Sequence, residues 1–223
     1  MTQPIVVINP NSTEAVTQGI HRALDPLRMK DGPLIECLTL AEGPPGIETQ
    51  AHVDAVVEPL LGAIRAREDS ASAFVIACYS DPGLEPARRT TQKPVFGIAE
   101  SAMVVALTRG HRFGIISILD SSIPRHARAV TAAGLDSRFA GDVAIGVSVT
   151  GLANEEDVWS RLLAAGESLR DRHSADAIIL GCAGMARYRA RLESALARPV
   201  VDPTQAAVTL AIGAVRLLPS SKA

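Results

Sequence analysis

The segments Ala73-Phe-Val-Ile-Ala-Cys78 and Ala177-Ile-Ile-Leu-Gly-Cys182 are each an apolar run of strand length that ends on a cysteine. A Pro-Val pair follows each cysteine after 16 or 17 residues, at Pro94 and at Pro199. Apolar runs of this length are typical of central strands that helices cover on both faces of a parallel sheet. The two segments therefore predict two similar α/β halves, each with a thiol at the end of a central strand.

The likeness between the halves extends beyond the cysteine segments. Pro4-Ile-Val-Val-Ile-Asn9 opens the first half and Arg112-Phe-Gly-Ile-Ile-Ser117 opens the second, and each leads through polar turn residues into a segment of helical period. The two cysteines are 104 residues apart, and Asn9 and Ser117 are 108 residues apart. These near-equal offsets predict two pseudo-symmetric lobes, one of residues 1–99 with 205–223 and the other of residues 100–204.

Short apolar runs alternate with helical segments along the chain, which predicts βαβ units and mostly parallel sheets flanked by helices. The expected strands are residues 5–8, 35–40, 74–77, 95–98, 113–116, 143–149, 178–180 and 200–201. The expected helices are residues 15–27, 49–67, 100–108, 123–133, 155–172, 185–196 and about 204–218, the last packing on the first lobe. The fold class is thus α/β with two lobes, and we expect an active site in the cleft between them.

The composition limits the class of protein. Of the 223 residues 47% are hydrophobic and 21% are charged, with a net charge of -2, as in ordinary globular α/β proteins. Because acidic and basic residues are interspersed, we expect no nucleic-acid partner. No segment approaches the length that crosses a bilayer. Because Met1 leads almost directly into the first strand, we expect no signal peptide. With three cysteines and no export signal, we expect a cytoplasmic protein with reduced thiols and no membrane partner.

The position of Cys78 and Cys182 suggests a chemistry for them. Parallel sheets bind ligands beyond the carboxyl ends of their strands, where helices begin. A helix N-terminus favours a thiolate, so we expect the pKa of both thiols to lie below the usual ~8.5. Free cysteine often packs as a small hydrophobe, and we assign Cys37 to that class. The pattern by itself leaves two roles open for Cys78 and Cys182. They could pack as small hydrophobic residues, or they could form a functional pair of acid/base groups that face one carbon.

Five motifs, in the same order along the chain, resemble one family. They are Val7-Ile-Asn-Pro-Asn-Ser-Thr13, Gly43-Pro-Pro-Gly-Ile-Glu48, Ile76-Ala-Cys-Tyr-Ser-Asp-Pro-Gly-Leu84, Gly97-Ile-Ala-Glu100 and Leu180-Gly-Cys-Ala-Gly-Met185. Over nearly its whole length the chain looks like a hydantoin racemase of the aspartate/glutamate racemase superfamily, in the branch that also holds allantoin racemases. The resemblance implies a cofactor-independent racemase for a 5-substituted hydantoin or a related ureide such as allantoin. It also implies a homo-oligomer.

On the family pattern Cys78 and Cys182 are the two bases of the racemase. One, as thiolate, removes the proton next to a carbonyl, and the other returns a proton from the opposite face. The resemblance also implies substrate contacts, at Asn11, Ile47, Tyr79, Ser80, Ser117, Ala183 and Gly184. Both Asn11 and Ser12 could instead cap the first helix. For Ser12 capping and binding stay equally open, whereas for Asn11 we expect binding. Where the family tends to carry paired threonines, this chain has Ser117-Ile118, which weakens the assignment to hydantoin itself.

Other chemistries are compatible with parts of this pattern. The same carbanion serves amino-acid racemases, maleate isomerases and arylmalonate decarboxylases, although such decarboxylases resemble the pattern with only one of the two cysteines. A non-catalytic two-lobed small-molecule-binding protein is the alternative from another class. The five histidines lack metal-ligand spacing, so we expect no metal and no cofactor. Arg88-Arg89 is interpreted as a solvated helix face, Asp81 as structural, and Pro82 as a helix start.

Overall fold

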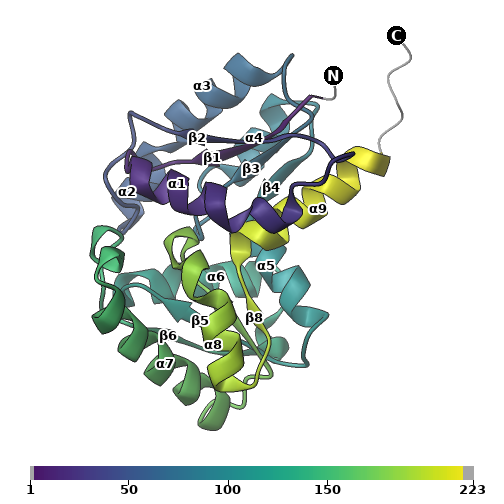
Figure 1. Ribbon diagram of the computed structural model, residues 1–223. Helices are drawn as coiled ribbons and strands as arrows, with labels where there is room; N and C mark the ends of the chain where they lie inside the picture. Colours follow the sequence, from purple (N-terminus) through teal and green to yellow (C-terminus); the bar gives the residue numbers. More distant parts are fainter. Residues whose placement is uncertain (1–2, 218–223) are drawn as a thin grey trace.

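The chain forms two lobes, each a four-stranded sheet with helices on both faces (Figure 1). The structure is a computed structural model and describes residues 3–217. The strand order is β2-β1-β3-β4 in the first sheet and β6-β5-β7-β8 in the second, and all neighbouring strands are parallel. Because both halves of the chain have the same strand order, the predicted α/β fold class with two pseudo-symmetric lobes is confirmed.

The strands place the two cysteine segments at equivalent positions. The first sheet consists of β1 (Ile5–Asn9), β2 (Ile35–Thr39), β3 (Ala73–Ile76) and β4 (Val95–Gly97). The second sheet consists of β5 (Phe113–Ser117), β6 (Phe139–Ala144), β7 (Ala177–Leu180) and β8 (Val200–Val201). By strand order β3 corresponds to β7, and both are fully buried central strands, as their continuous apolar sequences predict.

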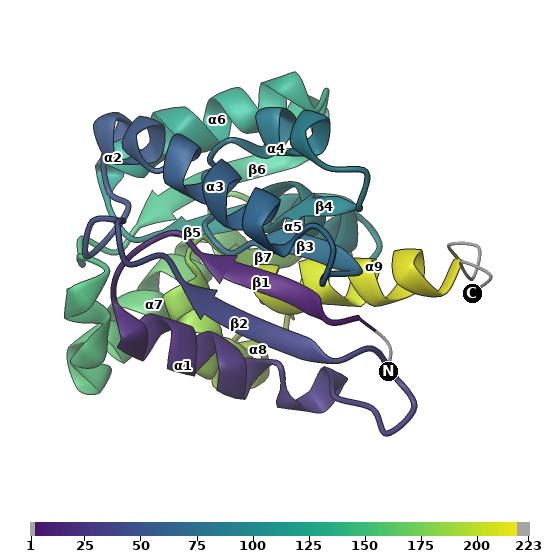
Figure 2. The same ribbon diagram turned by 90° about the horizontal axis from the view of Figure 1, so that it is seen from above.

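Helices cover both faces of the first sheet (Figure 2). One face carries α2 (Gln50–Ala55), α3 (Val57–Arg67) and α4 (Leu84–Thr90), and the other carries α1 (Glu14–Ala23) and α9 (Pro203–Leu217). Because successive side chains of β1 point to opposite faces of the sheet, β1 contributes residues to the apolar layers on both faces. Val6 and Ile8 pack in the layer of α3, whereas Ile5 and Val7 pack in the layer of α1 and α9.

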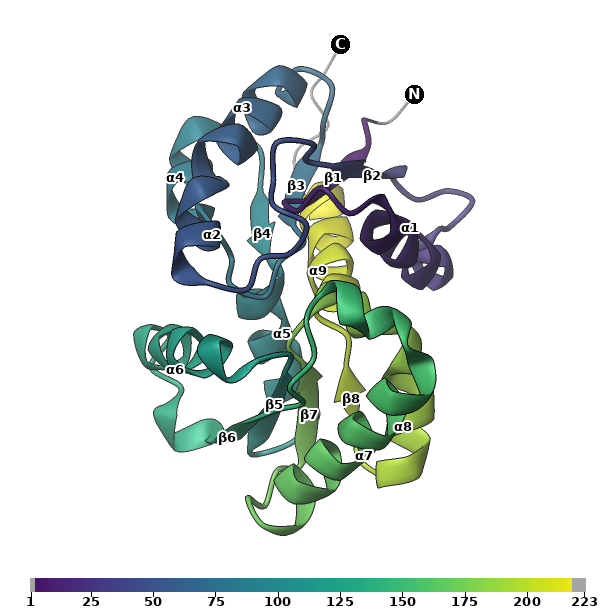
Figure 3. The same ribbon diagram turned by 90° about the vertical axis from the view of Figure 1, so that its left-hand side faces the viewer.

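The second lobe repeats this layering, and the chain passes between the lobes twice (Figure 3). One face of its sheet packs against α5 (Ile98–Leu107) and α6 (Ile123–Ala132), and the other against α7 (Glu155–Asp171) and α8 (Arg189–Leu196). The crossings are equivalent: β4 leads into α5 and β8 leads into α9, and these two helices pack on each other. None of the helices within residues 3–217 is long and apolar enough to cross a membrane.

The exact division of the chain between the lobes stays a prediction. It assigns residues 1–99 with 205–223 to one lobe and residues 100–204 to the other. Residues 1–2 and 218–223 of that division lie outside the described residues. Helix α9 packs on β1, β3 and β4 of the first sheet, although it follows the last strand of the second.

Two expected elements have different bounds because of local chemistry. The expected helix 49–67 is two helices, α2 and α3, because Pro59 lacks an N–H and its ring excludes a helical carbonyl four residues earlier, at Ala55. The helix expected to begin at Pro82 begins at Leu84, since Gly83 takes a positive φ of 64° as its N-cap.

The expected strand 143–149 is also wrong in its bounds. The strand β6 ends at Ala144, and the following residues leave the sheet. The N–H groups of Ile145 and Val147 bond to the carbonyls of Ser117 and Ile118, at and beyond the end of β5. These two bonds continue the pairing with β5 for a short distance beyond β6, and the apolar residues of this segment are buried in a loop.

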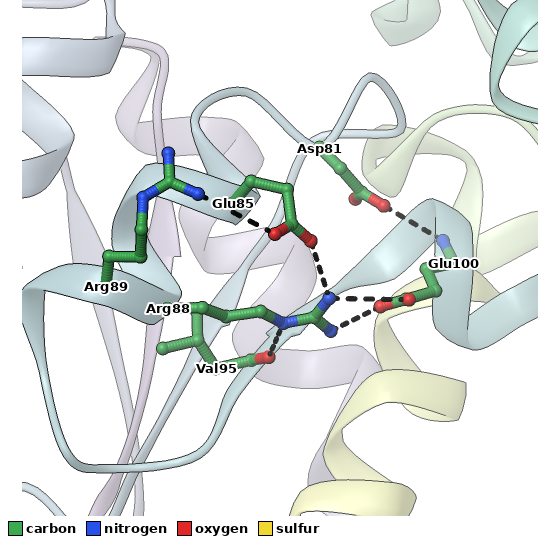
Figure 4. Close-up of polar contacts among 6 residues, drawn as sticks. All are labelled: Asp81, Glu85, Arg88, Arg89, Val95 and Glu100. Atoms are coloured by element: carbon green, nitrogen blue, oxygen red, sulfur yellow. Dashed lines mark hydrogen bonds and ion pairs between the residues drawn. The ribbon is translucent and has the colours of Figure 1, made fainter. Parts of the chain in front are cut away.

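Asp81 connects the loop after the first cysteine to the start of α5 (Figure 4). Its two carboxylate oxygens accept hydrogen bonds from the N–H groups of Ala99 and Glu100, each at 2.9 Å. Arg88 of α4 forms ion pairs with Glu85 and Glu100, and its Nε donates to the carbonyl of Val95 at 3.2 Å. This cluster joins α4 and β4 of the first lobe to the first turn of α5.

The arginine pair next to this cluster was interpreted as a solvated helix face. Arg89 is exposed, with 72% of its side-chain surface accessible, as that interpretation expects. Arg88 is exposed as well, although less so, with 34% of its side-chain surface accessible. Its guanidinium is held between carboxylates of α4 and α5, which the sequence separation of these residues did not indicate.

Gly97, the last residue of β4, lies against the Asp81 carboxylate, and an added Cβ there would lie 2.3 Å from the Asp81 Cγ. We expect Gly97→Ala to lower the free energy of unfolding by about 1–3 kcal/mol, because Asp81 must leave the N–H groups that it caps. Gly62→Ala is the matched control, since a Cβ at this position in α3 meets nothing within 4 Å. That variant is expected to gain about 0.5–1 kcal/mol. Urea denaturation of both variants checks this, and equal effects would contradict it.

Candidate active site

Cys78 and Cys182 each lie two residues beyond the end of a central strand, β3 for the first and β7 for the second. Both are free cysteines, and both line one cavity of about 30 Å³ between the lobes. By the measure that a water molecule needs about 10–15 Å³, this cavity has room for about two waters.

The cavity wall contains most of the residues that the resemblance singled out. Of the seven predicted substrate contacts, six line the cavity together with the cysteines: Asn11, Ile47, Tyr79, Ser80, Ala183 and Gly184. The wall also contains residues that were not predicted: Val16, Ile118, Ser122, His126 and Val149. Both lobes supply wall residues, so the cavity depends on how the lobes are held together. Contact of these residues with a substrate stays a prediction.

Burial dominates the chemistry of the two thiols. It raises the pKa of Cys78 to about 12 and that of Cys182 to about 11. In each case the backbone N–H two residues further on, from Ser80 or from Gly184, bonds to the sulfur and partly opposes this rise. The predicted lowering of the thiol pKa values is therefore wrong. The backbone effect on which it was based is outweighed by burial: α4 begins only at Leu84, and Cys182 is the N-cap of a short 3-10 helix only.

Asn11 lies in the turn between β1 and α1, and the hydrogen bonds of the turn fix its carboxamide. Its oxygen accepts from the N–H of Thr13 at 2.9 Å and from Nδ2 of Asn9 at 3.0 Å. Because the oxygen is occupied, the amide NH₂ is the group that Asn11 can offer to a ligand in the cavity. The alternative role as a helix cap is not found, since α1 begins at Glu14 without a side-chain cap.

Ser117 is the one predicted contact that does not line the cavity. It is fully buried at the end of β5, and its hydroxyl donates to Asp142 Oδ1 at 2.6 Å and lies 2.9 Å from His126 Nδ1. The same His126 nitrogen lies 2.8 Å from Asp142 Oδ2, so Nδ1 carries the hydrogen and donates it to the carboxylate. Ser117 and Asp142 thereby fix a histidine ring that does line the cavity.

The ring of His126 is fixed on its other side as well. It packs edge-on against Tyr79, with ring centroids 4.9 Å apart and an angle of 84° between the planes. The hydrogen bonds of the ring to described residues all involve Nδ1. Nε2 is thus the nitrogen with which this residue can meet a ligand in the cavity.

Arg125 and Glu48 link the two lobes beside the cavity. Arg125, in the first turn of α6, donates to the carbonyl of Glu48 at 3.3 Å, and its Nε lies 3.4 Å from Ser80 Oγ. The Glu48 carboxylate in turn accepts from the N–H of Val149 at 2.9 Å. Burial lowers the pKa of Arg125, and the nearby Cys78 opposes this effect.

Neither His126 nor Arg125 belongs to a motif that the sequence singled out. Both lie in the first turn of the helix after β5, whereas Asn11 lies in the turn before α1. Spacing of histidines along the chain gave no signal, because the partners of His126 come from two different strands. Among residues 3–217, no three His, Cys, Asp or Glu side chains are grouped so as to hold a metal ion.

Comparison with known proteins gives consistent matches. The family model described as Asp/Glu/Hydantoin racemase matches residues 5–211. The hydantoin racemase of Rhizobium meliloti is 36% identical over 93% of this chain and 86% of its own, and that of Pseudomonas sp. (strain NS671) is 33% identical over 93% and 84%. Among solved structures, the allantoin racemase from Klebsiella pneumoniae superposes with a TM-score of 0.90 at 32% identity, covering 97% of this chain and 89% of its own.

The raised thiol pKa values make a prediction about alkaline pH. The folded protein keeps protons that the unfolded chain releases above the ordinary thiol pKa of 9.0, so the free energy of unfolding should fall as the pH rises from about 9 towards 11. Thiolate absorbance of the folded protein should develop only above about pH 10. Cys78→Ser and Cys182→Ser identify the two contributions. If both thiols of the folded protein formed thiolate with a midpoint at about pH 8.5, the prediction would be contradicted.

Proposed function

The chain belongs to the Asp/Glu/Hydantoin racemase family, and we propose that it inverts the carbon next to a carbonyl in a 5-substituted hydantoin or a related ureide such as allantoin. It is an enzyme of the racemase and isomerase class. One observation carries the proposal: two thiols at equivalent positions of two lobes line the same small cavity. Inversion needs a proton acceptor on one face of a carbon and a proton donor on the other, which two such groups supply.

In the proposed reaction one thiolate takes the proton from C5, and the electron pair passes to the adjacent carbonyl as an enolate. The thiol on the opposite face then gives its proton to C5. The carbon is inverted, the first sulfur is now a thiol, and the second is a thiolate, so Cys78 and Cys182 exchange roles for the other enantiomer. Atoms and charge balance without a cofactor.

Burial of the sulfurs serves this chemistry in one respect and limits it in another. A thiolate whose conjugate acid has a pKa near 11 or 12 is a stronger base towards a weak carbon acid than an ordinary thiolate. The same shift makes the thiolate scarce at neutral pH. The N–H groups of Ser80 and Gly184, bonded to the sulfurs, favour the charged form. The proposal therefore expects kcat/KM to rise with pH through the neutral range.

His126 and Asn11 are proposed to bind the polar edge of the ring. His126 Nε2 and the Asn11 amide nitrogen belong to side chains in the cavity wall whose other polar atoms are held by the protein. Because Nδ1 of His126 carries the hydrogen, Nε2 accepts a hydrogen bond and suits a ring N–H of the substrate. The Asn11 amide nitrogen donates and suits the carbonyl oxygen that becomes the enolate, where a preorganised donor lowers the barrier.

Both hydantoin and allantoin are supported as substrate classes. The similarity to two curated hydantoin racemases supports the first, and the superposition on an allantoin racemase supports the second. The direct contact of Ser117 with a substrate is the weakest of the predicted contacts, because its hydroxyl is committed to Asp142 and His126. Assembly into a homo-oligomer and a cytoplasmic location stay predictions.

The decisive variants are Cys78→Ser and Cys182→Ser. In deuterium oxide the wild type should exchange the C5 proton of a chiral 5-substituted hydantoin or of allantoin, and the optical rotation should fall to zero. Each variant should lose racemisation by at least about 10³-fold, because a hydroxyl is a far weaker acid and base at this position than a thiol. Polarimetry measures the loss, and proton NMR measures the exchange.

Cys37→Ser is the matched control for these variants. Cys37 lies in β2 and does not line the cavity, so its replacement should leave the rate within about twofold. Full racemase activity in both Cys78→Ser and Cys182→Ser would exclude the two-thiol mechanism. Ligand binding without proton exchange would indicate a binding protein, and release of carbon dioxide from a disubstituted malonate would indicate a decarboxylase.

The role of His126 predicts a separate pattern. His126→Gln should lower kcat/KM by about 10-fold or more, because a mobile amide replaces the fixed imidazole acceptor that orients a ring N–H of the substrate. Asp142→Asn, which removes the carboxylate that holds the hydrogen on Nδ1, should lower kcat/KM as well. Steady-state kinetics on protein of verified thermal stability separates this from a structural role. An unchanged kcat/KM in His126→Gln would remove His126 from the mechanism.

A further inference from the structure

A second, larger cavity lies beside the cysteine cavity. Its volume is about 470 Å³, against about 30 Å³ for the cysteine cavity. Helix α1 forms one wall, and residues 149–152 with the 3-10 helix η5 (Ala183–Tyr188) form the other. Figure 3 shows α1 of the first lobe above the segment that leads into α7 of the second. The two cavities share four wall residues: Val16, Val149, Ala183 and Gly184.

Gly184 is the thinnest part of the shared wall. Its N–H bonds to the sulfur of Cys182, and a Cβ at this position would lie 3.7 Å from that sulfur. The same Cβ would lie 2.9 Å from Cδ1 of Leu152, which lines the larger cavity. A carbon atom beside the Cys182 sulfur therefore has the larger cavity on the far side of a single glycine. A substituent on that carbon reaches the larger cavity past Gly184 when the end of the Leu152 side chain shifts aside.

The charged residues in the wall of the larger cavity are all basic. Arg22, from the last turn of α1, and Arg187, from η5, line it, and no Asp or Glu is among its lining residues in the described part of the chain. The remaining lining side chains are small or apolar. The wall is therefore suited to a ligand with a negative charge at the end of a short apolar stem.

The two arginines differ in how firmly they are held. The guanidinium of Arg187 donates to the carbonyl of Leu152 and to the hydroxyl of Tyr188, and it lies 4.8 Å from the centre of the Tyr188 ring. Arg22 is exposed, and no ion pair of its side chain is found among residues 3–217. Arg187 thus offers a preoriented group, and Arg22 a cation whose charge no described carboxylate neutralises.

We propose that the larger cavity binds the C5 substituent of the substrate, and that this substituent is a short aliphatic chain ending in a carboxylate. The inference rests on the racemase function proposed above and adds the substrate class to it. Guanidinium groups bind carboxylates through charge-assisted, often bidentate hydrogen bonds, and Arg22 and Arg187 supply two such groups. Hydantoins of acidic amino acids, such as 5-(2-carboxyethyl)hydantoin, have this chemistry.

The test compares this compound with 5-(2-carbamoylethyl)hydantoin, a neutral amide of nearly the same shape. The wild type should show a kcat/KM about 10–100-fold higher for the acid, the range expected for hydrogen bonds to a charged group. Arg22→Gln should lower this preference about tenfold. Arg89→Gln is the matched control, because Arg89 is an exposed arginine on α4 that lines neither cavity, and it should leave the preference unchanged.

A third substrate, 5-methylhydantoin, reports the two-thiol reaction without the acidic group. Equal kcat/KM for the acid and the amide, with 5-methylhydantoin still exchanging its C5 proton, would overturn the substrate class and leave the proposed function standing. Faster turnover of allantoin than of the acid would overturn it as well. Absence of exchange with all three hydantoins and with allantoin would overturn both proposals. If Arg22→Gln and Arg89→Gln lowered the preference for the acid equally, the preference would come from the long-range charge of the protein and not from contact with Arg22. That result would also contradict the inference.

Discussion

The burial of two thiols against one small space is the constraint on which the rest of the site depends. Removal from water raises the pKa of Cys78 and Cys182, and the N–H groups of Ser80 and Gly184 only partly offset this effect. Both N–H groups come from the tight turn that follows the central strand in each lobe. The repeat of the fold thus supplies each sulfur with one donor and buries both, which suits the exchange of roles that we propose for them.

The cavity exists only because the lobes are held at one separation. Helices α5 and α9 cross between the lobes, and the Asp81 carboxylate caps the first of them. Arg125 and Glu48 add hydrogen bonds beside the thiols. These polar links are few and partly exposed, whereas the cores of the lobes are apolar and closely packed.

Much of the fold and of the site was predictable, and the failures have physical causes. Strands with continuous apolar sequence, such as β3 and β7, were recognisable because burial on both faces leaves no polar position. The edge strand β6 was misplaced because the most apolar residues after it line a buried loop. The cysteines were found through the repeat, but the direction of their pKa shifts was not, since burial by the other lobe outweighs any local backbone effect. His126 escaped prediction because Ser117 and Asp142 orient it from separate strands.

The sequence by itself determined the two α/β halves, the place of each thiol beyond a central strand, and the resemblance to a racemase family. These properties follow from local periodicity and from short motifs, which any segment carries without its partners. Only the tertiary structure decided which groups share a cavity, which way the thiol pKa values move, and that a larger cavity lined by Arg22 and Arg187 adjoins the cysteines. Those properties depend on the desolvation and the separation of side chains from different lobes, and the sequence of neither lobe contains that information.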